Sequence, residues 1–184
     1  MRVAIIGYGF VGKAVEFGIK NNLKTFKVDP NLGTEISELV NFKPNVCFIC
    51  VPTPMNDDGS QDTSILQKVI DDLLLYSISS LVILKSTILP NYVNKFQKLI
   101  PDLVLNPEFL RERHANQDFI NSKLIVLGGP IESTKLAANF YKNYTKCIED
   151  NYKHTDLVTA ALIKYSINTF LALKVTFFNQ LHDV

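Results

Sequence analysis

Residues 2–29, RVAIIGYGFVGKAVEFGIKNNLKTFKVD, run from an apolar segment through a glycine-rich turn to a second apolar segment that ends in an acid. Residues 3–6 have the composition of a buried strand, and Gly7 directly after them can take the positive φ that a sharp turn into a helix needs. Gly9 has no Cβ, so a pyrophosphate can approach its backbone, and Gly12 allows the helix to pack closely on the strand. The pattern predicts a strand, a turn and a helix that hold a dinucleotide.

The same stretch favours NAD over NADP. The predicted helix begins at Phe10 and Val11, where free N–H groups and the positive end of the helix dipole favour the charge of a pyrophosphate. Asp29 follows Gly12 by 17 positions, where a carboxylate accepts both ribose hydroxyls and repels a 2′-phosphate. A GxGxxG string alone is often only a tight turn. With strand, helix and acid in place, we interpret Gly7, Gly9, Phe10, Val11, Gly12 and Asp29 as an NAD-binding set.

Length and composition favour one main domain. The chain has 184 residues, of which 47% are hydrophobic, and this is enough to bury one full core. The net charge of +1, without charge runs, gives no basic field of the kind that nucleic-acid binding requires. The N-terminus is a predicted strand rather than a signal sequence, and no uncharged apolar run is long enough to span a membrane. We expect a cytoplasmic protein without nucleic-acid or membrane partners.

Three cysteines, an odd number, suit a reducing compartment. Cys47 and Cys50 form a CxxC pattern within VCFICV, a run typical of a strand. Residues three apart in a strand point to opposite faces of the sheet. We therefore interpret both as buried core thiols rather than a redox pair or a metal site, and we predict no metal.

Apolar strands alternate with amphipathic helices along the chain, which predicts an α/β fold with a Rossmann-type, doubly wound, mostly parallel sheet. The expected strands are residues 3–6, 25–28, 46–51, 81–85, 103–105 and 124–127. The expected helices are residues 10–21, 34–42, 63–76, 91–99 and 131–144. A helical period continues over residues 155–181, roughly 40 Å at about 1.5 Å per residue, too long for this domain. Residues 1–150 are thus expected to form the dinucleotide-binding domain and 151–184 a long linking helix.

Ligands bind at the carboxyl ends of the strands in such sheets, so three loops are expected to form the site. They follow Val51, Lys85 and Leu105, and they read PTPMNDDGSQD, STILP and NPEFLRER.

The strings GYGFVG, VPTP, KSTILP, NPEFLRE, LIVLGG and ALIKYSINTFLALKVTFFNQL occur in this order over almost the whole chain. In order and spacing, the chain resembles the nucleotide-sugar dehydrogenases, the UDP-glucose/GDP-mannose dehydrogenase family. Unrelated Rossmann proteins share only the glycine-rich turn, so the ordered set is specific. The resemblance implies oxidation of the C6 alcohol of a nucleotide sugar, of the UDP-glucose or GDP-mannose type, to the uronic acid with reduction of two NAD.

The resemblance also implies roles for residues in the three loops. Pro52 and Thr53 of VPTP would contact NAD. Thr87 of KSTILP matches a threonine beside the nicotinamide, where a hydroxyl can hold a water or steady a proton relay; taken alone, it can also cap a strand end. Glu108 matches a general base near the sugar, although a loop glutamate is usually just solvated.

On the long helix, Lys164 and Asn168 are four residues apart and share one face. In the family this pair reaches the sugar oxygen, where an ammonium would stabilise the oxyanion formed during hydride transfer. Without the resemblance, Lys164 reads as a surface lysine of an amphipathic helix. The substrate-binding residues that the resemblance implies are Glu108, Phe109, Leu110, Glu112, Lys164 and Asn168.

The chain departs from the family in three respects. In the family, the cysteine nucleophile of the second step and the nucleotide-gripping C-terminal domain follow the long helix, and residues 1–184 do not include them, so these residues alone are expected not to complete oxidation to the acid. Ala161 stands where the family usually has a glutamate. Arg113 stands where it usually has a glycine, and this cation can either reshape the sugar pocket or pair with a phosphate.

Two hypotheses of different class follow. The first is an NAD-dependent nucleotide-sugar 6-dehydrogenase of which this chain carries the cofactor half. The retained family residues favour it, namely Thr87, Glu108, Lys164 and Asn168. The second is a non-catalytic NAD-binding module or fragment that has lost the chemistry. A β-hydroxyacid dehydrogenase also has a helix with lysine and asparagine after its Rossmann domain, but KSTILP followed by NPEFLRE argues against it.

The long helix carries more apolar side chains than one sheet can cover. An exposed apolar stripe normally marks an interface, and helices of the family's central region pair across a two-fold axis. We expect a homodimer through this helix, or poor solubility of the isolated chain. The alternative is that the helix folds back and is buried by its own domain.

Overall fold

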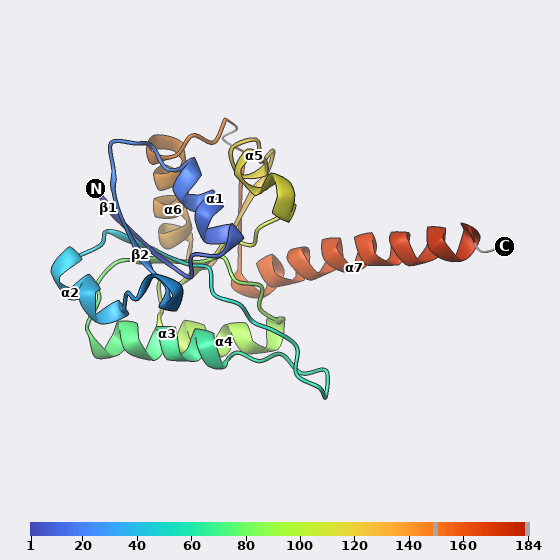
Figure 1. Ribbon diagram of the computed structural model, residues 1–184, viewed down its shortest axis with the longest axis horizontal. Coiled ribbons are helices and arrows are strands. Elements are labelled where there is room, and N and C mark those ends of the chain that lie inside the picture. Colours follow the sequence, from blue (N-terminus) through green and yellow to red (C-terminus); the bar gives the residue numbers. More distant parts are fainter. Residues whose placement is uncertain (149–150, 183–184) are drawn as a thin grey trace.

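A computed structural model describes residues 1–148 and 151–182, and in it one sheet lies between two layers of helices (Figure 1). Its strands are β1 (Arg2–Ile6), β2 (Lys24–Val28), β3 (Val46–Ile49), β4 (Leu81–Leu84), β5 (Val104–Leu105), β6 (Ile125–Gly128) and β7 (Tyr152–Thr155). Their order is β2-β1-β3-β4-β5-β6-β7, and all neighbours are parallel except β5 and β6, which pair antiparallel through Leu105 and Gly128. The predicted α/β, mostly parallel fold is confirmed.

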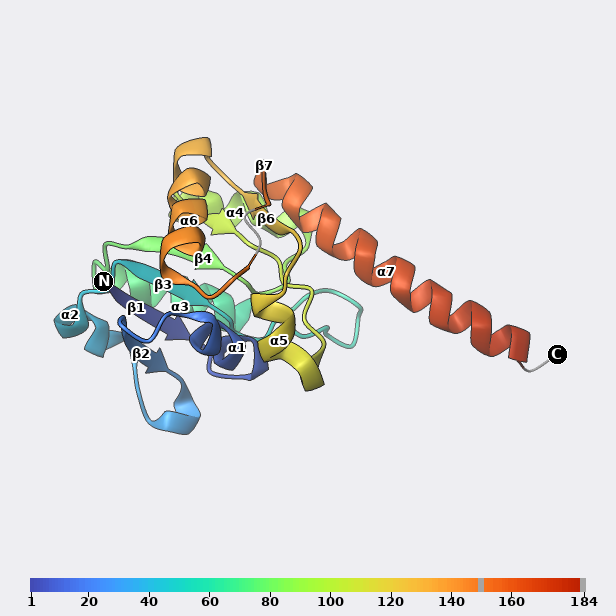
Figure 2. The same ribbon diagram turned by 90° about the horizontal axis from the view of Figure 1, so that it is seen from above.

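The helices divide between the two faces of the sheet (Figures 1 and 2). One face packs against α1 (Phe10–Gly18), α5 (Ala115–Ile120) and α6 (Ile131–Tyr144). The other packs against α2 (Leu39–Phe42), α3 (Ser64–Leu75), α4 (Pro90–Leu99) and the start of α7 (Leu157–His182). Short 3-10 turns form at Pro30–Leu32, Ile36–Glu38 and Glu112–His114. Because alternate residues of each strand face opposite layers, both faces of the central strands are apolar.

Several elements differ from the predicted ranges. α5 and β7 were not predicted; β7 is a short strand with partly exposed polar residues, and it has no apolar run to mark it. The helix predicted over residues 34–42 begins later, with a 3-10 turn at Ile36, and ends where Lys43 takes a φ of 51° before Pro44. α1 ends at Gly18 because Ile19 is extended and forms a bridge with Thr145. The predicted domain boundary at residue 150 lies outside the described residues.

Helix α7 leaves the domain after two turns (Figures 1 and 2). Asp156 directly precedes the helix, and its carboxylate accepts the Thr159 N–H at 2.8 Å in the manner of an N-cap. Its buried residues are Leu157, Ala160, Ala161 and Lys164, whereas residues 166–182 are exposed. The alternative in which the helix folds back onto its own domain is therefore wrong. By length and composition α7 could also cross a membrane, because an 18-residue window within it has a mean hydropathy of 1.2.

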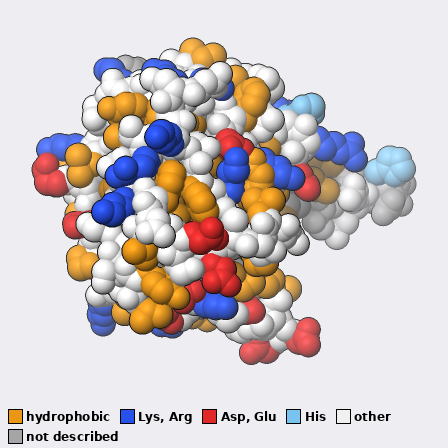
Figure 3. All heavy atoms as spheres, turned by 60° about the vertical axis from the view of Figure 1, so that its left-hand side comes forward, with side chains coloured by type: hydrophobic (Ala, Val, Ile, Leu, Met, Phe, Trp, Pro, Cys, Tyr) orange, Lys and Arg blue, Asp and Glu red, His pale blue; other side chains and the backbone are white. Residues whose placement is uncertain are grey.

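One face of the domain carries charges of both signs (Figure 3), and Cys47 is buried whereas Cys50 is half-buried. Figure 3 shows a face on which lysine, arginine, aspartate and glutamate side chains are intermixed with apolar ones. Cys47 packs in the layer of α3 and α4, and Cys50 packs against the opposite layer, as their spacing predicts. Burial raises the pKa of Cys47 to about 11 and that of Cys50 to about 12, so both thiols stay protonated at neutral pH.

Candidate functional site

Two glycines of the turn after β1 are required by the packing of the chain itself. Gly7 has a φ of 89°, and a Cβ there would lie 2.7 Å from the carbonyl oxygen of Cys50. A Cβ on Gly12 would lie 2.2 Å from the carbonyl oxygen of Gly7, so α1 could not pack this closely on β1. Both findings confirm what the sequence predicted for Gly7 and Gly12.

Gly9 is different, because its missing side chain leaves open space. A Cβ built on Gly9 would meet nothing within 4 Å in the part of the chain that the structure describes. Gly9 is the N-cap residue of α1, it supplies no side-chain cap, and the first turn of the helix contains no acidic residue. Free N–H groups and a bare backbone at a helix N-terminus suit a phosphate group. The cradle therefore fits the pyrophosphate of a dinucleotide.

Asp29 lies beside this cradle at the end of β2. Its Oδ2 accepts the N–H of Tyr8 at 2.6 Å, and its Oδ1 accepts the N–H of Asn31 at 2.9 Å. These backbone donors, first that of Tyr8, lower the pKa of Asp29, so the group is a carboxylate at neutral pH. Each carboxylate oxygen can accept a further hydrogen bond, which leaves capacity for two ribose hydroxyls. The nearby Lys27 is 2.8 Å from Glu16 and is thereby paired.

The loops after β3 and β4 meet at the backbone of Thr87. Its carbonyl oxygen accepts hydrogen bonds from Thr53 Oγ1 at 2.5 Å and from Gln61 Nε2 at 2.9 Å. Thr87 is half-buried and Pro52 is exposed, so both remain reachable from the edge of the sheet. The structure thus brings the VPTP and KSTILP segments together at the carboxyl ends of adjacent strands.

Glu108 and Lys164 form a buried ion pair between the loop after β5 and the second turn of α7. Their side chains are 11% and 7% exposed, and Lys164 Nζ lies 2.9 Å from Glu108 Oε1. Lys164 also donates to the carbonyl oxygen of Glu108 and lies 5.3 Å from the centroid of the Phe109 ring. Glu108 Oε2 accepts the N–H of Leu110 at 2.6 Å, so both carboxylate oxygens are engaged. The interpretation of Lys164 as a surface lysine is therefore wrong.

The remaining predicted residues lie around this pair or apart from it. Phe109 packs partly against the α3 and α4 layer and Leu110 against the opposite layer. Asn168 is exposed, one turn further along α7. Glu112 and Arg113 are exposed in the 3-10 turn before α5, and Ala161 is buried in the core.

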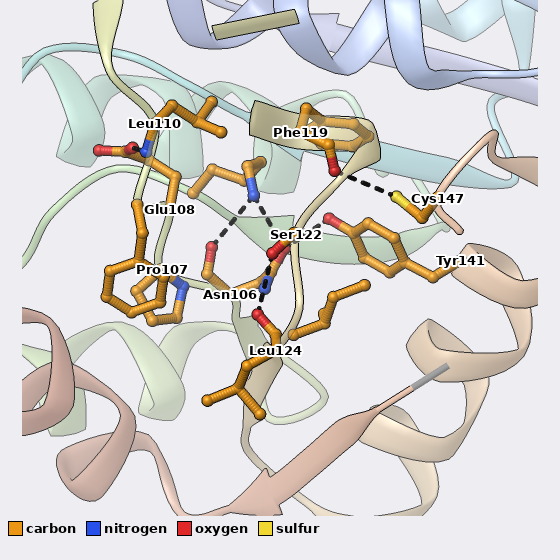
Figure 4. A pocket seen from close by; sticks show the side chains of 12 residues that line it. Asn106, Pro107, Glu108, Leu110, Phe119, Ser122, Leu124, Tyr141 and Cys147 are labelled. Carbon is orange, nitrogen blue, oxygen red and sulfur yellow. Dashed lines mark hydrogen bonds between the residues drawn. The ribbon is translucent and has the colours of Figure 1, made fainter. Parts of the chain in front are cut away.

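A polar network that the sequence did not reveal lies behind the Glu108 loop (Figure 4). Lys85 and Asn106 are 4% and 2% exposed, and Lys85 Nζ donates to Asn106 Oδ1 at 2.9 Å. Tyr141 donates to the same oxygen, and Asn106 Nδ2 donates to the carbonyl oxygen of Val126 at 2.8 Å. Burial lowers the pKa of Lys85. The network joins β4, β5, β6 and α6 where the sheet turns antiparallel, and a cavity of about 30 Å³ beside it has room for a single water.

Replacing Asn106 by alanine is expected to lower the free energy of unfolding by about 3 kcal/mol. The change leaves the buried Lys85 amine, the Tyr141 hydroxyl and the Val126 carbonyl without this partner, and each lost partner of a buried polar group costs about 1–3 kcal/mol. Urea unfolding followed by circular dichroism measures the effect. Asn94→Ala, at an exposed position of α4, is the control and should change stability by less than about 0.5 kcal/mol. Equal stabilities of the two variants would show that the network is not a structural element.

Gln61 also belongs to the site, and the sequence did not reveal it. It stands in a polar loop among other polar residues, so its type and position give no signal of a tertiary role. Lys85 does carry a weak signal, because it ends the buried strand LVILK, where a charge needs a partner.

Comparison with known proteins places this geometry in a family. Residues 15–147 match the NAD binding domain of the UDP-glucose/GDP-mannose dehydrogenase family. The UDP-glucose 6-dehydrogenase of Rickettsia bellii is 37% identical over 148 residues, which cover 74% of this chain and 33% of that protein. The UDP-glucose 6-dehydrogenase of Haloferax volcanii is 30% identical over 169 residues, covering 82% of this chain and 39% of that protein.

Solved structures show the same fold. The UDP-glucose dehydrogenase of Pyrobaculum islandicum superposes with a TM-score of 0.82 at 23% identity, over 98% of this chain and 52% of that one. The GDP-mannose dehydrogenase of Pseudomonas aeruginosa gives a TM-score of 0.78 at 23% identity, over 97% of this chain and 52% of that one. The chain thus spans about a third of the length of these curated relatives and about half of these structures. Because this family's model matches residues 15–147, the chain belongs to the UDP-glucose/GDP-mannose dehydrogenase family through its NAD-binding domain.

Proposed function

We propose that this chain is the cofactor half of an NAD-dependent nucleotide-sugar 6-dehydrogenase whose substrate is of the UDP-glucose or GDP-mannose type. The observation that carries the proposal is the buried Glu108–Lys164 pair. It lies at the carboxyl ends of the parallel strands, on the same edge as the glycine-rich turn. A module that only binds NAD needs no buried lysine and carboxylate there. The names of the relatives, UDP-glucose 6-dehydrogenases, support the same chemistry.

Each residue of the pair has a defined task in this proposal. Bound NAD would accept the hydride from C6 of the sugar. The Lys164 ammonium, held by Glu108, would stabilise the negative charge that develops on the C6 oxygen, because a preoriented cation in a water-poor site is effective there. Glu108 would act as general base in the later hydrolytic half, and Thr87 would hold a water or relay a proton. Asn168 would join Lys164 at the sugar, with Phe109, Leu110 and Glu112 lining the substrate.

The proposed cofactor site consists of the glycine-rich turn, the acid after β2 and the loops after β3 and β4. Its residues are Gly7, Gly9, Phe10, Val11, Gly12, Asp29, Pro52, Thr53 and Thr87.

The purified chain is expected to bind NAD more tightly than NADP, and Asp29→Ala should lower that preference about 30-fold. Two hydrogen bonds from ribose hydroxyls to a carboxylate contribute about 2 kcal/mol, and only NAD loses them in the variant. Calorimetric titration of both dinucleotides into both proteins measures the ratio. Asp71→Ala, at an exposed position of α3, is the control. Equal affinity of the wild-type chain for the two dinucleotides, or an unchanged ratio in Asp29→Ala, would contradict the assignment.

We also propose that two copies of this chain pair through α7. The exposed large apolar residues of its outer half are Phe170, Leu171, Leu173, Val175, Phe177, Phe178 and Leu181. So many exposed apolar side chains on a protruding helix normally mark an interface. The membrane alternative is less favourable for the helix as a whole, because its start is buried in the domain with Lys164 paired there.

A further inference from the structure

The amide of Gln61 connects three segments that are distant in sequence. Gln61 lies in the loop after β3, where it forms a bridge with Met55. Its Nε2 donates to the carbonyl oxygen of Thr87 at 2.9 Å, and its Oε1 accepts the N–H of Leu89 at 2.9 Å. Its Nε2 also donates to the hydroxyl of Tyr165 on α7 at 3.4 Å. The side chain of Gln61 thus joins its own loop, which follows β3, to the Thr87 loop and to the helix that carries Lys164.

Residues 85–89 lie between the end of β4 and the start of α4. The N–H groups of Lys85 and Ser86 still donate to the carbonyl oxygen of Ile49, whereas the Thr87 carbonyl and the Leu89 N–H bond to side chains. Thr53 supplies one donor to the Thr87 carbonyl, and Gln61 supplies the other. The Leu89 N–H donates to the side-chain oxygen of Gln61. Without this amide, the loop that presents the Thr87 side chain loses two of the bonds that fix it.

The third hydrogen bond of Gln61, at 3.4 Å, connects its side chain to α7. Tyr165 directly follows Lys164, so a bond to its hydroxyl helps to set the rotation and height of the first turns of α7. Burial raises the pKa of Tyr165, and the hydrogen bond from Gln61 opposes this rise. Only a primary amide offers a donor and an acceptor in one plane, as these partners require, whereas a carboxylate would offer acceptors alone.

We propose that Gln61 is a positioning residue that couples the NAD-binding loop to the Thr87 segment and to the helix that carries Lys164. The proposal rests on the proposed function. It adds that NAD binding near VPTP changes the environment of Tyr165 through the side chain of Gln61. The positions of the cofactor loops and of the helix that carries Lys164 are thereby coupled.

Two variants separate the bonds of this amide. Gln61→Glu keeps an acceptor for the Leu89 N–H and removes the donor to Thr87 and Tyr165, whereas Gln61→Ala removes all three bonds. Ser60→Ala is the matched control, because the Ser60 hydroxyl bonds to Asp58 and Asn56 within its own loop. NMR of the full chain, with labelled amides and tyrosine rings, reports the exchange rate of the Leu89 N–H and the titration of Tyr165. Calorimetry gives the affinity for NAD.

In Gln61→Ala we expect exchange of the Leu89 N–H to accelerate at least tenfold, whereas Gln61→Glu retains most of its protection. Both variants should raise the titration midpoint of Tyr165 and weaken NAD binding about tenfold. Saturating NAD should shift the Tyr165 ring signals in wild type and Ser60→Ala, and this shift should be lost in both Gln61 variants. If Gln61→Ala does not fold, Gln61→Glu carries the same test at Tyr165 and NAD.

Two other outcomes have different meanings. A Gln61 variant that binds NAD with wild-type affinity and still transmits the shift to Tyr165 would overturn the coupling. A wild-type chain that does not bind NAD at all would overturn the proposed function and the coupling of NAD to Tyr165 with it. In that case the Leu89 exchange and Tyr165 titration, both measured without NAD, would still show whether Gln61 ties the three segments together.

Discussion

Replacing Gly12 by alanine is expected to abolish measurable NAD binding and to lower the free energy of unfolding by about 3 kcal/mol or more. The added Cβ would lie 2.2 Å from the Gly7 carbonyl oxygen, closer than atoms can approach, and 3.2 Å from Ile5 Cγ2, which is a tight contact. Because the nearer obstacle is backbone, α1 must move away from β1, and overpacking of this kind costs about 1–3 kcal/mol or more. This movement displaces the N-terminus of α1, which forms the cradle for the pyrophosphate. Urea unfolding and calorimetric titration with NAD measure the two effects.

Gly9→Ala is the matched control, since it adds the same methyl group three residues earlier. Its Cβ would meet nothing within 4 Å among the described residues, and its φ of −74° suits alanine, so stability should change by less than about 0.5 kcal/mol. NAD binding should nevertheless weaken at least about tenfold, because the methyl group occupies the approach of the pyrophosphate. Unchanged NAD affinity in Gly9→Ala would contradict the cradle. Unchanged stability in Gly12→Ala would contradict the packing role of Gly12.

This difference between the glycines shows what can be inferred from a sequence. A strand followed by GxGxxG and a helix imposes short-range geometry, so Gly7 and Gly12 could be assigned to φ and packing before the fold was known. The alternation of strands and helices likewise predicted the sheet and its carboxyl edge. Local pattern was enough for these features because the turn depends on residues close in the chain and each of the central strands is marked by its own apolar run.

The features that local pattern missed depend on distant partners. Lys164 reads as a surface lysine until α7 is placed against the loop that carries Glu108, 56 residues away. Gln61 and Asn106 are polar residues in loops, and their role appears only when β3, β4, β5 and α7 converge. β7 was missed because it is short and polar, and its strand conformation comes from its pairing with β6.

Helix α7 was predicted from its periodicity, but its exposure decides what it does. On one side of the helix, Leu157, Ala161 and Lys164 are buried against the domain. Leu171 and Val175 continue the same side and are 52% and 61% exposed. The first turns therefore fix the direction of the helix. The outer turns protrude from the domain (Figure 2), and their apolar side chains are left uncovered.

Phe177→Lys is expected to weaken the proposed homodimer roughly 1,000-fold. Phe177 is 57% exposed on the outer half of α7 and stacks edge-on with Phe178. Pairing of two copies would therefore bury two Phe177 side chains, one from each copy. Burial of one phenylalanine contributes about 2 kcal/mol, so the two copies contribute about 4 kcal/mol, which corresponds to this factor in Kd. Light scattering coupled to size exclusion, repeated over a range of protein concentrations, measures the change from dimer to monomer.

The control is Leu75→Lys, which places the same charge on a residue of α3 that is 71% exposed. It should leave the dimer intact, because α3 lies on the body of the domain rather than on the protruding helix (Figure 1). A dimer that both substitutions weaken equally would indicate a general effect of charge on association. A wild-type chain that stays monomeric at every concentration would show that the outer half of α7 is not a contact between two copies. In a symmetric dimer each α7 would contact the same apolar residues of the other copy. If no such dimer forms, Phe177 and its neighbours would be covered by a different partner.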